Sequence, residues 1–321
     1  MKNNELKVFS GSSNPELTKK ICEALGIEQG LLTSKKFSDG EIWVRFDENI
    51  RGQDVFVVQS TGQPSDNMIE LLIILDAAKR SSAGRITVVL PYYGYARQDR
   101  KDQPRVPISA RLFMDMIVKA GANRIISMDL HSMQIQGFVD IPFDHLFSRP
   151  AFMKHFRAKG LFDDPELLIV APDMGSVARS RSIAMYMQKG LAIIDKRRVA
   201  HNKAKAMNII GDVKGKKCMI IDDMVDTAGT IVAAAEHLKE EGAKEVQCAF
   251  THAVLSGPAI ERLRDSQVSV IYTTDTIALP KEKILPNMEI ISVANILASS
   301  IQRSHMNASI SDLFYEFNIE S

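Results

Sequence analysis

The sequence has neither an excess of charge of one sign nor a long apolar run. Its 40 lysines and arginines balance 39 aspartates and glutamates, which leaves a formal net charge of +1 over 321 residues. With no global field to attract nucleic acid or an anionic membrane, any cation cluster has to be local. No segment approaches the roughly 20 apolar residues of a membrane span, and the N-terminus lacks the apolar centre of a signal peptide. We therefore expect a cytoplasmic protein that binds neither nucleic acids nor membranes.

Cysteine is scarce, and its spacing argues against two classes of cysteine-stabilised domain. The chain has 3 cysteines, Cys22, Cys218 and Cys248, which lie far apart and in apolar segments. A disulfide framework or a zinc site is not expected from an odd number of widely separated thiols. We interpret all of them as small buried hydrophobic residues.

What the sequence does contain is an internal repeat. The segments GANRIISMDLH (121–131) and GAKEVQCAFTH (242–252) share a Gly-Ala start, an apolar strand and a final histidine, at an offset of 121 residues. The helix-like segments before them correspond at the same offset, whereas the preceding apolar runs, 86–90 and 217–221, are 131 residues apart. The first copy therefore has ten extra residues, which fall within PYYGYARQDRKDQPRVP (91–107).

The repeat and the length of the chain predict two domains. Two similar units that alternate strand and helix favour an α/β fold made of two doubly wound parallel sheets related by pseudo-duplication. We place the boundary within FDHLFSRP, which gives domains 1–148 and 149–304, with residues 305–321 packing back on the first. Chance similarity between two ordinary helix-turn-strand units is the alternative explanation.

The segment CMIIDDMVDTAGT (218–230) joins an apolar run to acidic and then small residues. We expect residues 218–221 to form a strand buried on both faces, as in a parallel sheet. We expect a helix to follow from Thr230 and to end at Gly242. The acidic residues and the turn then lie at the carboxyl end of a strand, where α/β proteins bind ligands.

The turn DTAGT within this segment has the features of a phosphate cradle. We expect Gly229 to let the backbone curl so that amides point one way, and Thr227 and Thr230 to add hydroxyl donors. Because no Gly-Lys-Ser/Thr follows, the turn suits a monophosphate rather than a nucleoside triphosphate. Asp222 and Asp223 can accept hydrogen bonds from vicinal hydroxyls, so the motif fits a sugar phosphate. The alternative, a helix N-cap preceded by acidic residues, needs only one Asp or Thr.

This segment resembles the 5-phosphoribosyl-1-pyrophosphate binding motif, which type I phosphoribosyltransferases share with ribose-phosphate pyrophosphokinases. Other stretches resemble the second family, in family order: FSGSSNPEL, KKFSDGE, YARQDRKD, MDLHSMQIQGF, APDMG, IDKRR, GDVKGK and THAVLSGPA. The similarity is greatest to the phosphate-activated bacterial class and implies two tandem phosphoribosyltransferase-like domains. It also implies transfer of the β,γ-pyrophosphoryl group of ATP to the anomeric hydroxyl of ribose 5-phosphate. The products would be AMP and 5-phosphoribosyl 1-pyrophosphate for nucleotide biosynthesis.

The resemblance implies roles for individual residues. The positions expected to bind ribose 5-phosphate are Arg198, Asp222, Asp226, Thr227, Ala228, Gly229 and Thr230. Those expected to bind ATP are Asp39, Gly40, Glu41, Arg97 and Gln98. Magnesium is expected at His131 and Asp173, and the basic flap residues Lys196 and Arg198 are expected to be catalytic. Without the resemblance, we would interpret Arg97 as part of a solvated loop, Lys196 as part of a basic surface turn, and His131 as a capping residue at the end of a strand.

A regulatory site is implied in the same way. Arg51, Ser309 and Ser311 match residues that in the family form an inter-subunit anion site for phosphate and inhibitory ADP. The resemblance therefore implies both effectors and a homo-oligomer, typically a hexamer built from dimers. The alternative is an ordinary surface arginine and a helix cap.

The sequence departs from the family pattern in two loops. Asp173 is followed by Met-Gly-Ser where the family commonly has a Gly-Gly pair. If this loop admits a phosphate close to the backbone at position 176, we expect Ser176 either to adopt a permissive conformation or to donate its hydroxyl instead. Pro104 stiffens a loop that the family keeps mobile. Neither change removes a charged group expected to be catalytic.

Two other functions compete with this interpretation. A type I phosphoribosyltransferase would have one such unit and a hood for the base, which the duplicated architecture does not favour. A non-catalytic subunit associated with a synthetase would have lost catalytic positions. His131, Asp173, Lys196, Arg198 and the DTAGT turn are all present, which favours an enzyme.

Overall fold

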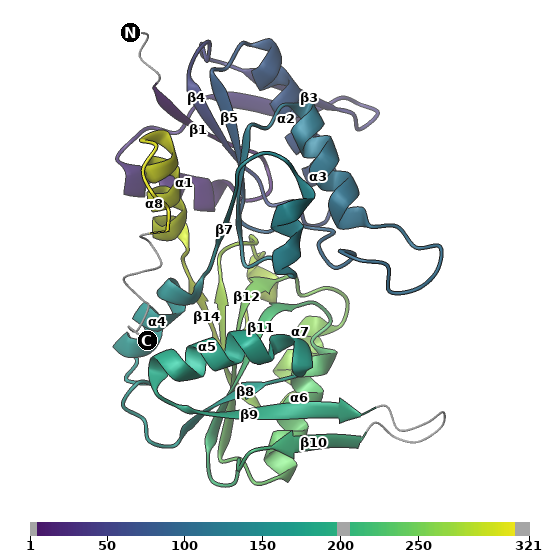
Figure 1. Ribbon diagram of the computed structural model, residues 1–321, viewed down its shortest axis with the longest axis vertical. Coiled ribbons are helices and arrows are strands. Elements are labelled where there is room, and N and C mark those ends of the chain that lie inside the picture. The colour runs from purple at the N-terminus through teal and green to yellow at the C-terminus, as the bar shows by residue number, and fades with distance from the viewer. Residues whose placement is uncertain (1–4, 198–205, 312–321) are drawn as a thin grey trace. The chain divides into compact units, whose positions relative to one another are not determined.

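The computed structural model describes residues 5–197 and 206–311. The chain forms two compact units (Figure 1). The first consists of the residues up to Ser148, of Thr276–Ala278 and of the C-terminal stretch that begins at Ser292. The second consists of Arg149–Asp275 and Leu279–Ile291. Residues 292–304, which the sequence had placed in the second domain, thus belong to the first unit.

The first unit is built on a five-stranded sheet in the order β1-β4-β5-β6-β7, in which every pairing is parallel. Its strands are β1 (Leu6–Ser10), β4 (Asp54–Val58), β5 (Arg85–Leu90), β6 (Arg124–Met128) and β7 (Phe143–Leu146). The hairpin β2 (Leu32–Lys36) and β3 (Ile42–Phe46) forms a separate antiparallel pair. Strands β4, β5 and β6 are almost entirely buried, as expected for a parallel sheet covered on both faces.

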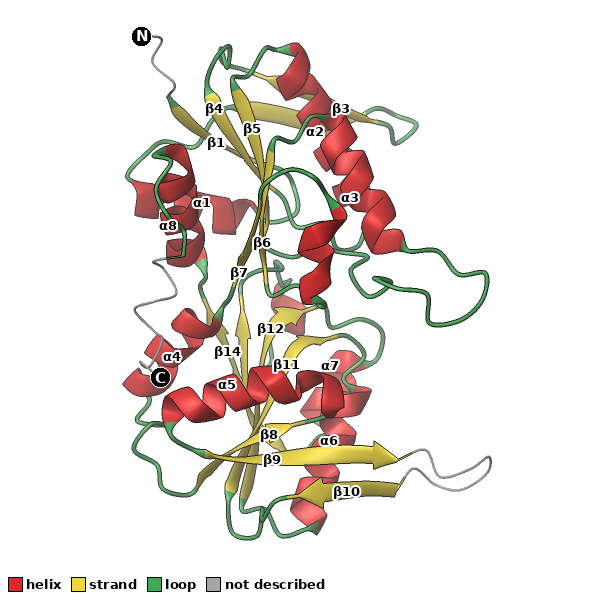
Figure 2. Ribbon diagram, in the orientation of Figure 1, coloured by secondary structure: helices red, strands yellow, loops and turns green. Residues whose placement is uncertain are grey.

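Helices cover the sheet of the first unit. They are α1 (Pro15–Leu25), α2 (Asp66–Arg80), α3 (Ser109–Ala120) and α8 (Ala294–His305), with a short 3-10 helix, η1 (Met133–Phe138). Figure 2 shows α1 beside α8 on one side of the sheet and α2 beside α3 on the other. Asn14 caps α1 by accepting from the Leu17 amide at 3.3 Å, and Gly26 ends the helix in the left-handed conformation.

Helix α8 returns to the first unit because a buried carboxylate holds its end. Asp54, fully buried at the start of β4, accepts from Arg85 Nε at 2.8 Å and from Arg85 Nη2 at 2.5 Å. His305 Nδ1 lies 2.8 Å from the same carboxylate, and Arg85 also donates to the Ser304 carbonyl oxygen at 2.9 Å. Contacts so distant along the chain leave no local sequence signal.

The second unit has a seven-stranded sheet in the order β10-β9-β8-β11-β12-β13-β14, parallel except for β10. Its strands are β8 (Leu167–Ala171), β9 (Gly190–Arg197), β10 (Ala206–Ile210), β11 (Lys217–Val225), β12 (Glu245–Ala253), β13 (Val268–Thr274) and β14 (Met288–Ile291). Its helices are α4 (Arg149–Ala158), α5 (Val177–Met187), α6 (Gly229–Glu240) and α7 (Ala259–Arg264), with 3-10 turns η2 (Met174–Ser176) and η3 (Lys281–Lys283).

Strand β11 separates two hydrophobic cores, as the predicted central strand should. Its residues Cys218 and Ile220 pack in the core that contains α6 and α7, and Met219 and Ile221 pack in the core that contains α4 and α5. This alternation follows from the period of two residues along a strand. All three cysteines are buried free thiols, as predicted.

The internal repeat corresponds to the β5-α3-β6 segment of the first unit and the β11-α6-β12 segment of the second. The predicted insertion lies in residues 91–108, between β5 and α3, whereas only residues 226–228 join β11 to α6. None of the helices in the described part of the chain is long and apolar enough to cross a membrane.

Candidate active site

The carboxyl ends of β8 and β11 form a topological switch point in the second unit. From β8 the chain moves through α5 to β9 on one side, and then returns to β11 on the other side of β8. Pairing between β8 and β11 stops at Val170 and Ile220, although β11 continues to Val225 beside β12. The flank of β11 beyond Ile220 is therefore not covered by β8, which is the usual position of a ligand site in such a sheet.

Asp222 and Asp223 lie on this last part of β11. The sequence predicted them after the strand, but they are inside it, because pairing with β12 extends the strand past its apolar run. Their side chains point to opposite faces. Asp223 forms an ion pair with Arg179 of α5, with 3.4 Å between Nη1 and Oδ1, so its charge is partly balanced.

The electrostatics of Asp222 differ from those of its neighbour. Burial, the adjacent carboxylate of Asp223 and the more distant one of Asp173 raise the pKa of Asp222 to about 8. Its Oδ1 accepts from the Asp223 amide at 2.9 Å, and a hydrogen bond with the Asp223 side chain adds to the rise in its pKa. Negative charge is thus costly at this position, and a hydroxyl donor or a cation would relieve the cost.

The predicted phosphate turn, Asp226–Thr230, connects β11 to α6. Its sharp bend falls on Ala228, which has φ +60° and ψ 0° and is 4% exposed. The expectation that Gly229 supplies the curl was therefore wrong. A Cβ placed on Gly229 would meet only side-chain atoms, the nearest being Arg262 Nη1 at 3.4 Å. The left-handed conformation at an alanine costs about 1 to 2 kcal/mol, so surrounding contacts have to hold it.

The loop between β12 and α7 provides these contacts. The Leu255 amide donates to the Val225 carbonyl oxygen at 3.0 Å, and the Ser256 amide donates to that of Asp226 at 2.9 Å. The Ser256 hydroxyl also donates to the Asp226 carboxylate. On the other side of the turn, Arg262 Nη1 donates to the Thr227 carbonyl oxygen at 2.9 Å. The Asp226 carboxylate is thus engaged in holding the turn.

Asp173 follows β8 at the same edge of the sheet and caps η2. Its Oδ1 accepts from the Ser176 amide at 3.0 Å, and the Ser176 hydroxyl donates to the Asp173 carbonyl oxygen at 2.9 Å. Ser176 has φ −89°, an ordinary value, and its hydroxyl is used within the loop. The capping interactions of Asp173 and Ser176 thus hold this loop by contacts within it.

The residues expected to bind ATP lie in two loops of the first unit. Asp39, Gly40 and Glu41 form the exposed tip of the β2–β3 hairpin, where Asp39 Oδ1 accepts from the Glu41 amide at 3.1 Å. Gly40 has φ +96°, so this tight tip requires a glycine. The hairpin presents both carboxylates to solvent.

Arg97 and Gln98 lie in the long connection between β5 and α3. Gln98 Oε1 accepts from the Ser109 hydroxyl at 2.6 Å, and the Tyr95 ring stacks on Phe113 of α3 with 4.1 Å between centroids. These contacts hold the first part of the connection against α3 while Arg97 stays exposed. The stretch is therefore more ordered than a simple solvated loop.

His131 lies just beyond β6 in the first unit and is exposed. Asp129, at φ +38°, accepts from the Ser148 amide at 3.1 Å and from its hydroxyl. The Leu130 amide donates to His145 Nε2 at 3.0 Å. Hydrogen bonds of the two residues before it, Asp129 and Leu130, thus hold the backbone that leads to His131.

The two predicted flap residues differ in what can be said of them. Lys196 lies near the end of β9, where it is paired with Met207 of β10. Arg198 lies outside the described residues. The antiparallel hairpin of β9 and β10 thus leads directly to the segment that was expected to be catalytic.

Arg51, Ser309 and Ser311 are exposed residues of the first unit. The neighbour of Arg51, Gly52, donates its amide to the Ser82 carbonyl oxygen at 2.8 Å. Arg303 Nη1 donates to the Ser309 carbonyl oxygen at 2.8 Å, which ties this residue to α8. Each of the two predicted parts of the anion site is therefore held by the first unit.

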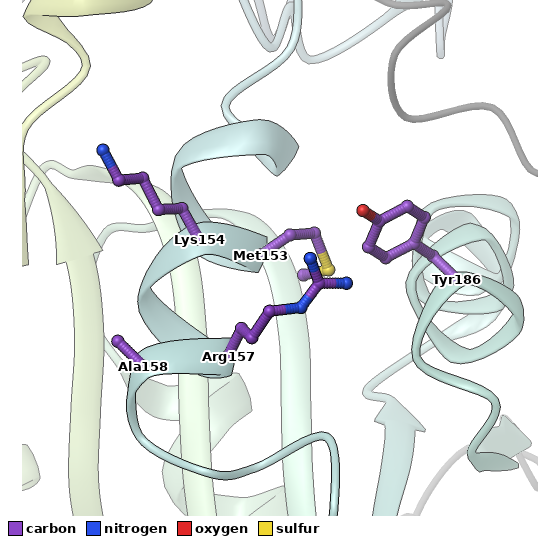
Figure 3. Close-up of a pocket in the computed structure, with 5 residues that line it drawn as sticks. All are labelled: Met153, Lys154, Arg157, Ala158 and Tyr186. Carbon is purple, nitrogen blue, oxygen red and sulfur yellow. The ribbon is translucent and has the colours of Figure 1, made fainter.

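A pocket of about 410 Å³ lies elsewhere in the second unit, between α4 and α5 (Figure 3). It is lined by Met153, Lys154, Arg157, Ala158 and Tyr186. The Arg157 guanidinium lies over the Phe162 ring, 4.7 Å from its centroid. The pocket contains none of the predicted site residues, so we do not assign it to the candidate active site.

Sequence reasoning missed Arg179, Ser256 and Arg262. Arg179 is in a run of alternating small and basic residues after the Asp173 loop, and Ser256 lies in the THAVLSGPA stretch that was noted only for its resemblance. No local pattern marks Arg262, because its partner carbonyl is 35 residues away.

Comparisons with known proteins agree with this geometry. A model of the N-terminal domain of ribose phosphate pyrophosphokinase matches residues 6–121, and one of the phosphoribosyl synthetase-associated domain matches residues 196–315. Ribose-phosphate pyrophosphokinases of Fusobacterium nucleatum and Caldanaerobacter subterraneus subsp. tengcongensis are 49% and 52% identical over 312 residues, 97% of this chain and 98% of each relative. Phosphoribosylpyrophosphate synthetase from Mycobacterium smegmatis has a TM-score of 0.89 at 41% identity, covering 95% of this chain and 100% of that chain. This last match confirms the predicted fold class.

Proposed function

This chain belongs to the ribose-phosphate pyrophosphokinase family, and we infer that it transfers the β,γ-pyrophosphoryl group of ATP to the anomeric hydroxyl of ribose 5-phosphate. The products are 5-phosphoribosyl 1-pyrophosphate and AMP. The observation that carries this function is a monophosphate-sized turn beside two carboxylates at a switch point, in a chain that matches 98% of the length of enzymes of that name. A single-unit phosphoribosyltransferase does not account for such a match.

Ribose 5-phosphate binding is proposed for the β11–α6 region. The backbone amides at the start of α6 have no intrahelical acceptor by helix geometry, and they would donate to the 5-phosphate together with Thr227 and Thr230. Asp222 would accept hydrogen bonds from the ribose hydroxyls, because the ion pair with Arg179 leaves Asp223 less available. Hydroxyl donors would in turn stabilise the ionised form of Asp222.

ATP binding is proposed for Asp39, Gly40, Glu41, Arg97 and Gln98, with the transferred group held by Lys196 and Arg198. Transfer requires in-line positioning of the anomeric hydroxyl and neutralisation of the phosphates more than covalent chemistry by the protein. Arg198 has a planar guanidinium that can form two hydrogen bonds to a phosphate in the ground state, so we propose that it binds both ribose 5-phosphate and the transferred pyrophosphoryl group. Lys196 is a flexible point charge, so we assign it to the charge of the transition state.

Magnesium is the proposed cofactor, with His131 and Asp173 as protein ligands. Asp173 lies near enough to Asp222 to raise the pKa of that carboxyl, so this edge of the sheet concentrates oxygen donors that suit a hard cation. No three His, Cys, Asp or Glu side chains within residues 5–197 and 206–311 converge on a metal position by themselves. Magnesium is commonly held by one or two carboxylates with substrate phosphates. When bound, it would neutralise phosphate charge during transfer.

Regulation and assembly are proposed from the resemblance to the family. We assign phosphate and ADP to the exposed Arg51, Ser309 and Ser311, and we propose a homo-oligomer, a hexamer in the family pattern. A cytoplasmic location fits this metabolic role.

A coupled assay tests the main proposal. With ATP, magnesium and ribose 5-phosphate, the nucleotide product should be AMP, formed in proportion to 5-phosphoribosyl 1-pyrophosphate. Accumulation of ADP in step with sugar phosphorylation would identify a different kinase and overturn the proposal. Absence of any turnover by correctly assembled protein would favour the non-catalytic subunit.

A further inference from the structure

We propose that Arg262 is a positioning residue for ribose 5-phosphate, because its guanidinium fixes the orientation of the Thr227–Ala228 peptide in the phosphate turn. The inference rests on the proposed function, since it concerns the same sugar phosphate site. It adds a residue of α7, distant along the chain from the DTAGT segment, to the machinery of that site.

The hydrogen bond of Arg262 determines where one amide of the turn points. Arg262 Nη1 donates to the Thr227 carbonyl oxygen at 2.9 Å. In a trans peptide the C=O and N–H bonds point in opposite directions. The amide of Ala228 therefore points away from Arg262, toward the face of the turn that we assign to the 5-phosphate. Donation by a cation also polarises the peptide and makes that amide a stronger donor.

The conformation that needs this support is strained. Ala228 is left-handed at φ +60°, a conformation that an L-residue with a Cβ adopts at a cost of about 1 to 2 kcal/mol. Without the Arg262 hydrogen bond, the peptide could rotate and relieve the strain by turning the Ala228 amide out of the site. A strained peptide held from outside is a common feature of preorganised ligand sites.

Two sets of contacts hold the turn: Ser256 binds its first residue, Asp226, and Arg262 binds the next residue, Thr227. Ser256 binds Asp226 through both its amide and its hydroxyl. Lys283 Nζ in turn donates to the Leu255 carbonyl oxygen at 2.9 Å, and Leu255 itself is left-handed at φ +46°. This support stops at Asp226, so Arg262 holds the carbonyl immediately before the strained residue.

The charge of Arg262 adds a second effect. Within the described part of the chain, no carboxylate lies within ion-pair distance of its guanidinium, although the side chain is exposed. A cation that is not neutralised beside an anion site strengthens attraction of the phosphate. Salt screens attraction of this kind between exposed charges, whereas the hydrogen bond to Thr227 persists in salt. The two contributions can therefore be separated.

The test compares Arg262→Met and Arg262→Lys with Arg264→Met. Arg264 is an exposed arginine of the same helix whose side chain makes no hydrogen bond or ion pair within residues 5–197 and 206–311, so it controls for the loss of surface charge. For Arg262→Met we expect KM for ribose 5-phosphate to rise about tenfold, while kcat and KM for ATP change less than about threefold. Arg262→Lys keeps a donor and should recover most of the affinity. Arg264→Met should resemble the unaltered enzyme.

Salt and direct binding complete the experiment. Most of the tenfold loss should persist when KCl is raised from about 0.05 to about 0.5 M, because screening removes only the part that comes from the charge of Arg262. Calorimetric titration with ribose 5-phosphate should show the same loss independently of turnover. Unchanged sugar phosphate affinity in Arg262→Met, or a loss that disappears in high salt, would overturn the positioning role. Failure of the unaltered enzyme to form AMP would instead overturn the proposed function.

Discussion

Replacing Asp222 with asparagine should make the protein more stable and its sugar phosphate site weaker. The carboxyl has its pKa raised from 3.8 to about 8 by burial and by the carboxylates of Asp223 and Asp173. A raised pKa means that folding disfavours the ionised form. Below the unfolded pKa, Asp222 is protonated in both the folded and the unfolded state and does not affect the free energy of unfolding. As the pH rises from about 4 to about 8, ionisation of Asp222 in the unfolded state progressively lowers that free energy.

The size of the gain can be worked out from this rise. At about 1.36 kcal/mol per pKa unit, a change from 3.8 to about 8 corresponds to roughly 5 to 6 kcal/mol. The Asp222 side chain is only partly buried, and water at its open flank reduces the cost. We therefore expect Asp222→Asn to gain about 2 to 3 kcal/mol at pH 9, and less at pH 6. For a protein of this size that is a rise in Tm of several degrees.

Thermal unfolding at a fixed protein concentration checks this prediction at pH 6 and pH 9. Asp223→Asn is the matched comparison: it removes one of the charges that raise the pKa of Asp222, but it also removes the ion pair of Asp223 with Arg179, so it should stabilise the protein less than Asp222→Asn does. Kinetics of Asp222→Asn should show a larger loss of affinity for ribose 5-phosphate than of turnover, because the role we propose for the carboxylate is to bind the ribose hydroxyls equally in the ground state and the transition state. A lower Tm for Asp222→Asn at pH 9 would refute the reasoning that charge is costly there.

Three further predictions concern other parts of the chain. Lys196→Ala should lose about a hundred- to a thousandfold in kcat, or about 2.7 to 4 kcal/mol, with little change in substrate affinity; steady-state kinetics that show only a raised KM would move the catalytic role to the arginines. Arg51→Ala should weaken phosphate activation and ADP inhibition together without loss of basal activity, and unchanged titrations with both anions would argue against a regulatory site here. Lys217→Met should remove the hydrogen bond that lowers the pKa of Asp164, so urea unfolding should show a lower midpoint at pH 7, and this difference should disappear as the pH falls through the lowered pKa of Asp164.

The sequence predicted the position of the turn between β11 and α6 well because the signals that define it are local. An apolar run identifies the buried strand, and the small and hydroxyl residues that follow mark its end. The same reasoning placed Asp222 and Asp223 just after the strand, whereas they lie within β11. The strand extends past its apolar run because its last residues pair with β12. Helix α8 was assigned to the wrong unit for a related reason. Its position depends on Asp54 and Arg85, which are more than two hundred residues away from His305.

The error at Gly229 has a more general physical cause. A glycine in a turn motif invites the inference that it adopts the left-handed conformation, since it does so without steric cost. Here the left-handed residue is Ala228, one position earlier. An alanine can be held there only because contacts from the β12–α7 loop and from Arg262 outweigh its intrinsic preference. Strain of this kind orients the turn before the ligand arrives, so binding does not have to order it. The glycine next to it lies beside the guanidinium that holds the turn, since a Cβ on Gly229 would be 3.4 Å from Arg262 Nη1.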